Sequence, residues 1–224
     1  MRGHDACARD GANRCFRPVR VPKGVPAITM PAKEEPHHRL FVAIEPPEAV
    51  REVLSALPER LRGVHWTPPH QYHLTLRFIG EVPASQVGRI REALGKVRVE
   101  PFLLPLAGVG RFPPRGRPRV LWAGTGSGDP RLFQLRQQVD DALLACGLDL
   151  DVRSFQPHFT LGRCNREARE SALAAFLRAR EGFAGPLFRV REFVLFESEL
   201  LASGARHTPL ERYPLREDGA RELC

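Results

Sequence analysis

Two short histidine motifs hold the residues of this sequence best suited to acid–base chemistry. His73-Leu74-Thr75-Leu76 and His158-Phe159-Thr160-Leu161 share the pattern His–apolar–Thr–Leu, and the two histidines are 85 residues apart. Both motifs lie in segments of strand-like composition. Because successive side chains of a strand point to opposite faces, each motif presents its imidazole and its hydroxyl on one face and its apolar side chain on the other.

If the two strands lie side by side, the motifs predict a cradle for a tetrahedral phosphate. One imidazole can take a proton from an attacking water while the other gives a proton to the departing oxygen. The unperturbed pKa of histidine, about 6.5, lets one ring be neutral and the other charged near neutral pH. The hydroxyls of Thr75 and Thr160 would hold the phosphate oxygens. A single His-x-Thr is common in ordinary strands, so the prediction depends on the repetition.

The composition of the 224 residues is that of a globular protein, with 42% hydrophobic and 27% charged residues. It excludes collagen-like, fully disordered and coiled-coil chains, and no apolar run is long enough to span a membrane. The net charge is +8; three of the 34 basic residues are lysines, so the remaining 31 are arginines. Arginine suits bidentate contacts to phosphate, which favours an RNA or nucleotide partner. A GC-rich genome would explain the same bias.

The five cysteines form no CxxC pair and fit no zinc pattern, and the N-terminal segment lacks the features of a secretion signal. We therefore expect a cytoplasmic protein that needs neither a metal nor another cofactor. Residues 1–38 are rich in glycine, proline and arginine without an apolar period, which predicts a disordered tail. Met30 lies just before the first apolar run, and we hypothesise that translation begins there. Residues 39–215 form the predicted domain, in two lobes, and 216–224 a C-terminal tail.

Within the domain, apolar patterns predict alternating strands and helices. Strands are expected at 39–45, within 64–80, and at 102–112, 119–125, 155–162, 188–197 and 210–215. Helices are expected at 47–61, 83–97 and 166–180, with a further helix that Asp129 caps and Pro130 begins. Strands and helices do not alternate strictly enough for a parallel sheet, so the pattern favours an α+β fold with antiparallel pairing.

The two motifs and their flanks resemble the two-histidine phosphoesterase superfamily. Within it, the sequence is similar to the bacterial and archaeal RNA 2′,3′-cyclic phosphodiesterases, once named 2′-5′ RNA ligases. The resemblance covers about residues 39–215. It is carried by RLFVAI from Arg39, HLTLRFIGEV from His73, VLW from Val120, PHFTLGR from Pro157 and RHTPL from Arg206.

The resemblance implies a bilobal α+β fold with a pseudo-twofold axis, in which two antiparallel sheets form a concave cleft and the helices pack outside. It implies hydrolysis of 2′,3′-cyclic phosphate ends of RNA, such as tRNA halves, to 2′-phosphomonoesters, and the older name adds a reversible 2′-5′ ligase activity. It assigns His73 as proton donor and His158 as proton acceptor, with Thr75 and Thr160 on the phosphate oxygens. We expect a monomer that acts on RNA ends or nucleotides.

Several other residues have both a functional and a structural interpretation. Arg163 either reaches the phosphate or is a surface arginine. Arg115 and Arg117, in the loop between two predicted strands, either contact the RNA backbone or belong to a solvated turn. Phe41 and Trp122 either stack on a base or belong to the core. The remaining histidines, including His207, are expected in solvated loops.

Two other classes of function compete with the enzyme. A nucleotide- or RNA-binding module on the same scaffold would need no pair of imidazoles. A metal hydrolase would use the histidines as ligands, but the sequence lacks an HExxH motif and an aspartate-rich cluster near either motif.

Overall fold

The computed structural model describes residues 35–150, 154–201 and 204–216. The predicted N-terminal tail and Met30 therefore lie almost entirely outside the described residues, as does nearly all of the predicted C-terminal tail. The first strand begins at His37, two residues before the predicted start of the domain.

The described residues form ten strands, four α-helices and one 3-10 helix. The strands are β1 (His37–Ile44), β2 (Val64–Trp66), β3 (Leu74–Pro83), β4 (Phe102–Ala107), β5 (Val109–Phe112), β6 (Val120–Gly124), β7 (His158–Cys164), β8 (Ala184–Val190), β9 (Glu192–Leu201) and β10 (Gly204–Pro214). The helices are α1 (Glu48–Ser55), η1 (Pro69–Gln71), α2 (Ala84–Leu94), α3 (Pro130–Ala145) and α4 (Glu170–Arg178).

The predicted α+β class with antiparallel pairing is confirmed. Within the described residues, eight strands form one sheet in the order β10-β9-β1-β3-β7-β6-β5, with β2 paired to β7, and β4 pairs with β8 in a separate two-stranded sheet. The two halves of the large sheet, β10-β9-β1-β3 and β7-β6-β5 with β2, meet at a single residue pair, Leu74 with Phe159. The two sheets expected from the resemblance are thus joined into one where the motifs meet.

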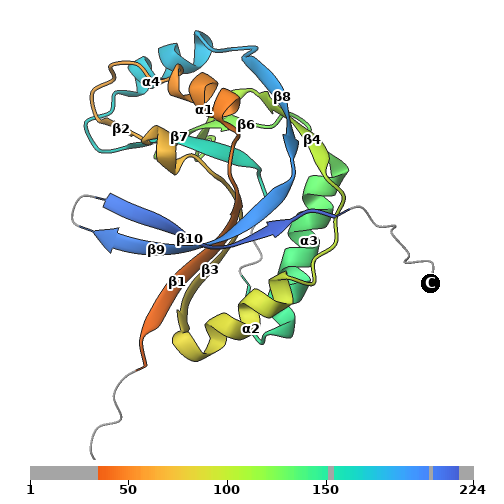
Figure 1. The fold of residues 1–224 in the computed structure, drawn as a ribbon. Coiled ribbons are helices and arrows are strands. Elements are labelled where there is room, and N and C mark those ends of the chain that lie inside the picture. The colour runs from red at the N-terminus through yellow and green to blue at the C-terminus, as the bar shows by residue number, and fades with distance from the viewer. Residues whose placement is uncertain (1–34, 151–153, 202–203, 217–224) are drawn as a thin grey trace, which may run out of the picture. The chain divides into compact units, whose positions relative to one another are not determined.

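The strands of the large sheet separate a main core from a smaller aromatic face. On β1, Leu40, Val42 and Ile44 are buried in the main core, which includes residues of α2 and α3 (Figure 1). Phe41 and Ala43 point to the opposite face and pack with Val194 and Phe196 of β9. We call this second side of the sheet the histidine face, because His73 and His207 contact Phe41 there.

Some elements end earlier than predicted, for local reasons. Helix α1 stops at Ser55 rather than Leu61, because Pro58 cannot continue a helix and also restricts the residue before it. The predicted strand 102–112 divides at Gly108, whose φ of +78° suits glycine, so that β4 pairs with β8 and β5 pairs with β6. The predicted start of α3 is confirmed, since the Asp129 side chain accepts a hydrogen bond from the amide of Arg131.

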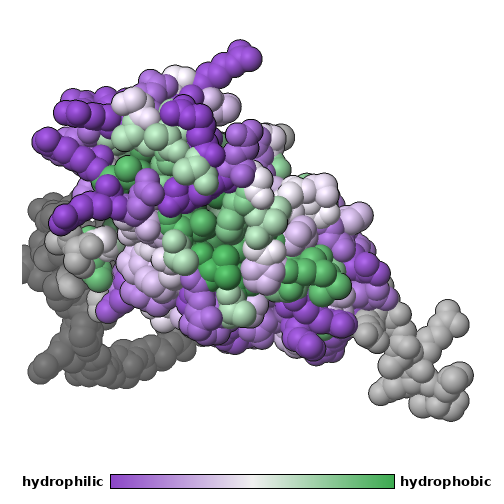
Figure 2. All heavy atoms as spheres, turned by 90° about the horizontal axis from the view of Figure 1, so that it is seen from above, coloured by the Kyte–Doolittle hydropathy of each residue, from purple (hydrophilic) through white to green (hydrophobic). Residues whose placement is uncertain are grey.

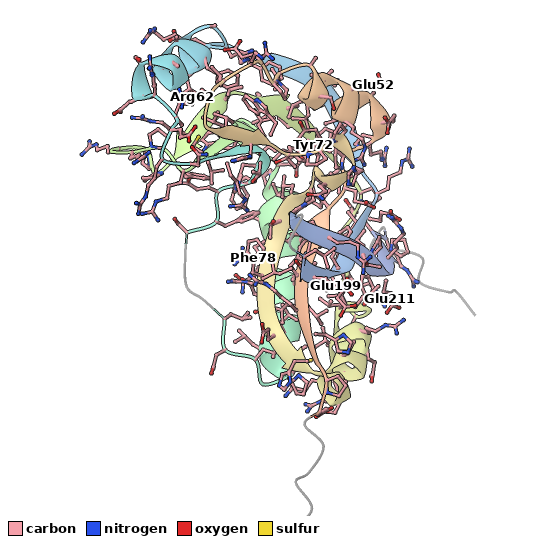
Figure 3. All side chains as sticks on the ribbon, turned by 90° about the vertical axis from the view of Figure 1, so that its left-hand side faces the viewer. Glu52, Arg62, Tyr72, Phe78, Glu199 and Glu211 are labelled. Atoms are coloured by element: carbon pink, nitrogen blue, oxygen red, sulfur yellow. The ribbon has the colours of Figure 1, made fainter. Side chains whose placement is uncertain are left out.

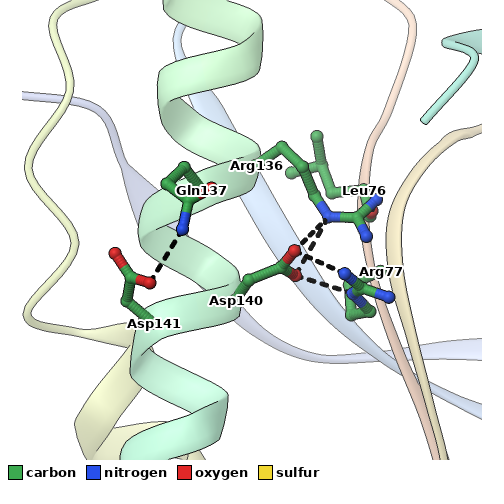
Figure 4. Close-up of polar contacts among 6 residues, drawn as sticks. All are labelled: Leu76, Arg77, Arg136, Gln137, Asp140 and Asp141. Atoms are coloured by element: carbon green, nitrogen blue, oxygen red, sulfur yellow. Dashed lines mark hydrogen bonds and ion pairs between the residues drawn. The ribbon is translucent and has the colours of Figure 1, made fainter. Parts of the chain in front are cut away.

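A cluster of charged side chains fastens α3 to the first motif (Figure 4). Asp140 of α3 accepts hydrogen bonds from Arg77 of β3 and from Arg136 one turn earlier on the helix. Arg136 also donates to the carbonyl of Leu76, the last residue of the first motif, and its guanidinium lies 5.0 Å from the ring centroid of Phe155. All three charged side chains are largely buried. The cluster therefore links segments close to both motifs.

Seen from the end that carries α1 and α4, hydrophilic side chains surround a central region of hydrophobic ones (Figure 2). None of the helices in the described ranges is both long and apolar enough to cross a membrane.

Candidate active site

The pairing of Leu74 with Phe159 brings the two motifs together. These residues are the second residues of the two motifs, and their strands run antiparallel. Continuing the register by one residue in each direction sets His73 opposite Thr160 and Thr75 opposite His158, on one face. The two histidines are then diagonal neighbours, about 7 to 8 Å apart in an ideal sheet. An approximate twofold axis passes through this pair, since a rotation about it would exchange the two motifs.

Both histidine rings are fixed by the same local hydrogen bond. Nδ1 of His73 lies 2.8 Å from the carbonyl oxygen of Gln71, and Nδ1 of His158 lies 2.7 Å from the carbonyl oxygen of Gln156. A carbonyl oxygen only accepts, so each Nδ1 must carry the hydrogen and donate it. In the neutral ring, Nε2 then keeps its lone pair and can accept a proton. Each ring can thus act as a base when neutral and as an acid when charged.

Aromatic side chains hold the two imidazoles in place. The His73 ring packs on Phe41, with centroids 5.0 Å apart, and the His158 ring meets Phe112 edge-on at 4.9 Å. Phe112 in turn packs against Trp122 at 5.3 Å. Phe41 is only 2% exposed, so it belongs to the interior, where its ring packs against that of His73, and it is not free to stack on a base. Trp122 is half-buried, and its Nε1 is buried without a hydrogen-bond partner among the described residues.

A one-residue bulge follows the threonine in each motif. Leu76 has no partner on β1, where Ala43 pairs with Thr75 and Val42 with Arg77. Leu161 likewise has no partner on β6, where Trp122 pairs with Thr160 and Leu121 with Gly162. Each bulge shifts the alternation of side chains by one residue. As a result Phe78 and Arg163, each five residues after its motif histidine, lie on the histidine face.

Burial and neighbouring positive charge both disfavour protonation of the site. Burial is the largest cause that lowers the pKa of His73, and together with the smaller effects of His207, His158 and Arg163 it brings the pKa to about 4, against the opposing effect of the hydrogen bond to Gln71. The pKa of His158 is lowered by burial and by Arg163, again against its backbone hydrogen bond. An anion on this face would offset these effects, because negative charge favours the protonated rings.

The two threonines and Arg163 complete the set of donors. The hydroxyls of Thr75 and Thr160 belong to half-buried residues, and neither has a hydrogen-bond partner among the described residues nor is buried away from solvent. Arg163 is exposed. Hydroxyl, guanidinium and imidazole groups together can donate hydrogen bonds to several oxygens of one phosphate.

The family that the sequence suggested is confirmed by comparison with known proteins. The sequence profile described as "LigT like Phosphoesterase" matches residues 44–122 and 125–207. The chain belongs to the LigT-like phosphoesterase family.

Relatives and solved structures of this family cover most of the chain. A protein of Archaeoglobus fulgidus named RNA 2′,3′-cyclic phosphodiesterase is 35% identical over 74% of this chain and 94% of its own length. A protein of the same name from Thermus thermophilus is 37% identical over 82% of this chain and 93% of its own. The crystal structure of TT0787 of Thermus thermophilus has a TM-score of 0.68 at 31% identity, over 81% of this chain and all of that one. Escherichia coli LigT complexed with 3′-AMP has a TM-score of 0.66 at 26% identity, over the same shares of the two chains.

The arginine loop of this family member lies beside the second motif. The loop joins β5 to β6, directly after the Phe112 that packs on His158. Arg115 and Arg117 are both exposed there, and Arg117 donates a hydrogen bond to the backbone carbonyl of Asn165. Arg111, in β5 just before the loop, is instead engaged in an ion pair with Glu170.

Two residues of the site were not predicted from the sequence. Phe78 is 65% exposed and lies on β3 (Figure 3), where its ring contacts Phe41 at 5.9 Å. Strict alternation would turn Phe78 into the core, and only the bulge at Leu76 reverses this. His207 was expected in a solvated loop, but it lies in β10 with its ring 5.2 Å from that of His73. No local signal in the sequence relates it to His73, which is 134 residues away.

The described residues contain a hollow outside this site, and they contain no cluster of metal ligands. A hollow of about 420 Å³ between α2 and α3 is lined by residues such as Lys96, Gln138 and Cys146, and none of the histidines lines it. No group of three or more His, Cys, Asp or Glu side chains in the described ranges is arranged to hold a metal ion.

Proposed function

We propose that this protein hydrolyses the 2′,3′-cyclic phosphate at the end of an RNA or nucleotide to a 2′-phosphomonoester. The observation that carries the proposal is the pairing of Leu74 with Phe159, because each of these residues follows a motif histidine whose Nδ1 donates to a backbone carbonyl. The names of the relatives in Archaeoglobus fulgidus and Thermus thermophilus support the choice of substrate.

In the proposed reaction, His158 is the general base and His73 the general acid. Nε2 of His158 takes a proton from a water molecule as its oxygen attacks phosphorus. The bond between phosphorus and the ribose 3′-oxygen breaks, and Nε2 of His73 gives its proton to that oxygen. Thr75, Thr160 and Arg163 hold the non-bridging phosphate oxygens and offset their charge. The order of the two histidines follows the family resemblance, since the geometry around the approximate axis is nearly the same for both.

We propose that the negative charge of the substrate favours protonation of His73, the general acid. The pKa of His73 is about 4, so its ring is neutral at pH 7. The cyclic phosphate carries one negative charge close to both rings. That charge favours a protonated imidazole, and we propose that substrate binding raises the pKa of His73 enough for it to act as a donor.

The rest of the RNA has supporting contacts on both sides of the motifs. Phe78 offers an exposed aromatic face to the base of the terminal nucleotide, and base–aromatic stacking is a common way to hold single-stranded ends. Arg115 and Arg117 would contact the RNA backbone next to His158. We also propose that the substrates include RNA ends such as tRNA halves and that the protein can catalyse the reverse reaction, 2′-5′ ligation. We expect it to act as a monomer in the cytoplasm.

The test is turnover of 2′,3′-cyclic AMP in the presence of EDTA, with the product identified by phosphorus NMR. We expect 2′-AMP as the single product and no effect of EDTA. Binding of the nucleotide without turnover would instead favour a binding module, and loss of turnover in EDTA would favour a metal hydrolase.

The pH dependence should separate the free protein from its complex. The reaction needs one protonated and one neutral ring, and both pKa values are lowered in the free protein. The singly protonated pair therefore becomes more abundant as the pH falls below 6.5, until the second ring is protonated too. We expect a bell-shaped kcat/KM with its optimum below pH 6.5, and a kcat optimum at higher pH because bound substrate raises both pKa values. Steady-state kinetics between pH 3.5 and 9 would check this, and a profile with a single limb would contradict it.

Removing the exposed aromatic ring should weaken recognition of the base. We expect Phe78→Ala to raise the KM for 2′,3′-cyclic AMP by roughly fivefold to a hundredfold with little change in kcat, because stacking on one base contributes about 1–3 kcal/mol. Phe78→Trp should keep the wild-type KM. A ribose 2′,3′-cyclic phosphate without a base should be hydrolysed equally by both proteins. Leu187→Ala is the matched control, since Leu187 is 60% exposed on β8, a strand of the separate two-stranded sheet. Equal losses with and without the base would argue against stacking.

A further inference from the structure

His207 places a third imidazole beside the two motif histidines. Its ring meets the ring of His73 edge-on at 5.2 Å and that of Phe41 at 5.0 Å. It comes from β10, two strands away from the strand of Phe41 in the sheet order, and pairs with Ser198 of β9. The acid–base mechanism proposed above uses no third ring.

The two ring nitrogens of His207 have different surroundings. Nδ1 is buried and has no hydrogen-bond partner among the described residues. Nε2 has no partner there either, but it is not among the buried unpaired atoms and therefore reaches the surface of the histidine face. A buried N–H without an acceptor is rare in proteins, so the neutral ring carries its hydrogen on Nε2 and leaves the lone pair on Nδ1. This tautomer is opposite to that of His73 and His158.

The tautomer decides what His207 can do. A ring that carries its hydrogen on Nε2 presents a donor, and no lone pair, to whatever occupies the histidine face. It can bind an oxygen there but cannot take a proton from water. The pKa of His207 is lowered by burial and by Arg163, so the ring stays in this neutral donor form near pH 7.

The position of the ring indicates the kind of oxygen that it meets. The bulge at Leu161 puts Arg163 on the histidine face, and its positive charge lowers the pKa of all three histidines. The exposed edge of His207 therefore faces a region where an anion is favoured. The hydroxyls of Thr75 and Thr160 lie on the same face, and neither has a partner among the described residues.

We propose that His207 is a substrate-binding residue whose Nε2–H donates a hydrogen bond to a phosphate oxygen of the bound nucleotide, on the side of His73. This inference rests on the proposed function for the identity of the nucleotide. It adds a donor that neither motif contains, and it makes His207 part of the phosphate site rather than a second acid or base.

The test is the affinity for 2′-AMP and for adenosine, measured by calorimetry without turnover. His207→Phe keeps a flat ring against His73 and Phe41 but removes the donor. His207→Gln restores a donor, because the side-chain amide nitrogen of glutamine can take the place of Nε2. We expect His207→Phe to weaken 2′-AMP binding by about tenfold or more, the usual scale for a hydrogen bond to a charged group. His207→Gln should recover most of that loss, and adenosine should bind all three proteins alike.

His37→Phe is the matched control, because His37 is an exposed imidazole at the start of β1, and it should bind 2′-AMP as the wild type does. The proposal is overturned if His207→Phe binds 2′-AMP normally, if glutamine and phenylalanine lower the affinity equally, or if adenosine binding falls in parallel. If the wild-type protein binds 2′-AMP more tightly than adenosine but does not hydrolyse the cyclic nucleotide, the proposed function is wrong. The same comparison of variants would still decide whether His207 binds the phosphate.

Discussion

Replacing either motif histidine by alanine is expected to lower kcat for 2′,3′-cyclic AMP by about a hundredfold to ten-thousandfold, the range for a lost general acid or base. His73→Ala removes the proposed donor and His158→Ala the proposed acceptor. Because the two rings act as one unit, the double variant should lose little more than the worse single variant. Steady-state kinetics on proteins with matched melting curves would measure this.

The same pair of variants can reveal which histidine is the acid. A phosphodiester with a p-nitrophenolate leaving group needs no proton donor. His73→Ala should therefore recover much of its activity on such a substrate, while His158→Ala should not, since water must still be activated. The reverse pattern would make His158 the acid and His73 the base. If neither variant recovers activity, the two histidines do not act as a separate acid and base. His70→Ala is a suitable control, because His70 is exposed in η1.

Replacing Asp140 is expected to cause the largest loss of stability. Its carboxylate accepts hydrogen bonds from both Arg77 and Arg136, and the exposed fractions of the three side chains are 16%, 10% and 13% in that order. Removing one partner from a buried ion pair costs about 3–5 kcal/mol, because the remaining charge stays desolvated. For a protein of this size, Asp140→Ala should lower Tm by roughly 6 to 20 °C. Thermal unfolding followed by circular dichroism would measure the change.

The chain offers a close control for Asp140. Asp141 is the next residue of α3, but it is exposed and accepts its hydrogen bond from Gln137 on the same helix (Figure 4). Asp141→Asn should change the free energy of unfolding by no more than about 0.5 kcal/mol. Similar melting temperatures for Asp140→Ala and Asp141→Asn would mean that the buried cluster contributes no net stability.

The chemistry of the two motifs could be predicted from the sequence because it depends on local rules. The period of a strand is two, so a histidine and a threonine two residues apart share a face wherever the strand is placed. The cap at Asp129 follows from the same kind of local rule and is present. The repetition of the pattern was the only sign that two distant strands belong to one site.

Other parts of the site depend on how strands pair, which no single segment determines. The bulges at Leu76 and Leu161 exist only because β1 and β6 skip those residues, and they bring Phe78 and Arg163 onto the histidine face. Without the bulge, alternation would place Arg77 beside Thr75 and turn Phe78 inward. The position of His207 follows from the order of β10, β9 and β1 across the sheet.

The amino-acid sequence by itself determined the reacting groups, their spacing within each strand and the class of chemistry they can perform. The tertiary structure alone decided which groups surround them, since strand order and register are set by packing of the whole core rather than by neighbours in the chain. It also decided their charge states, because burial and the field of Arg163 depend on the folded protein. Propensity and periodicity act over a few residues, whereas desolvation and strand pairing join residues that are far apart in the sequence.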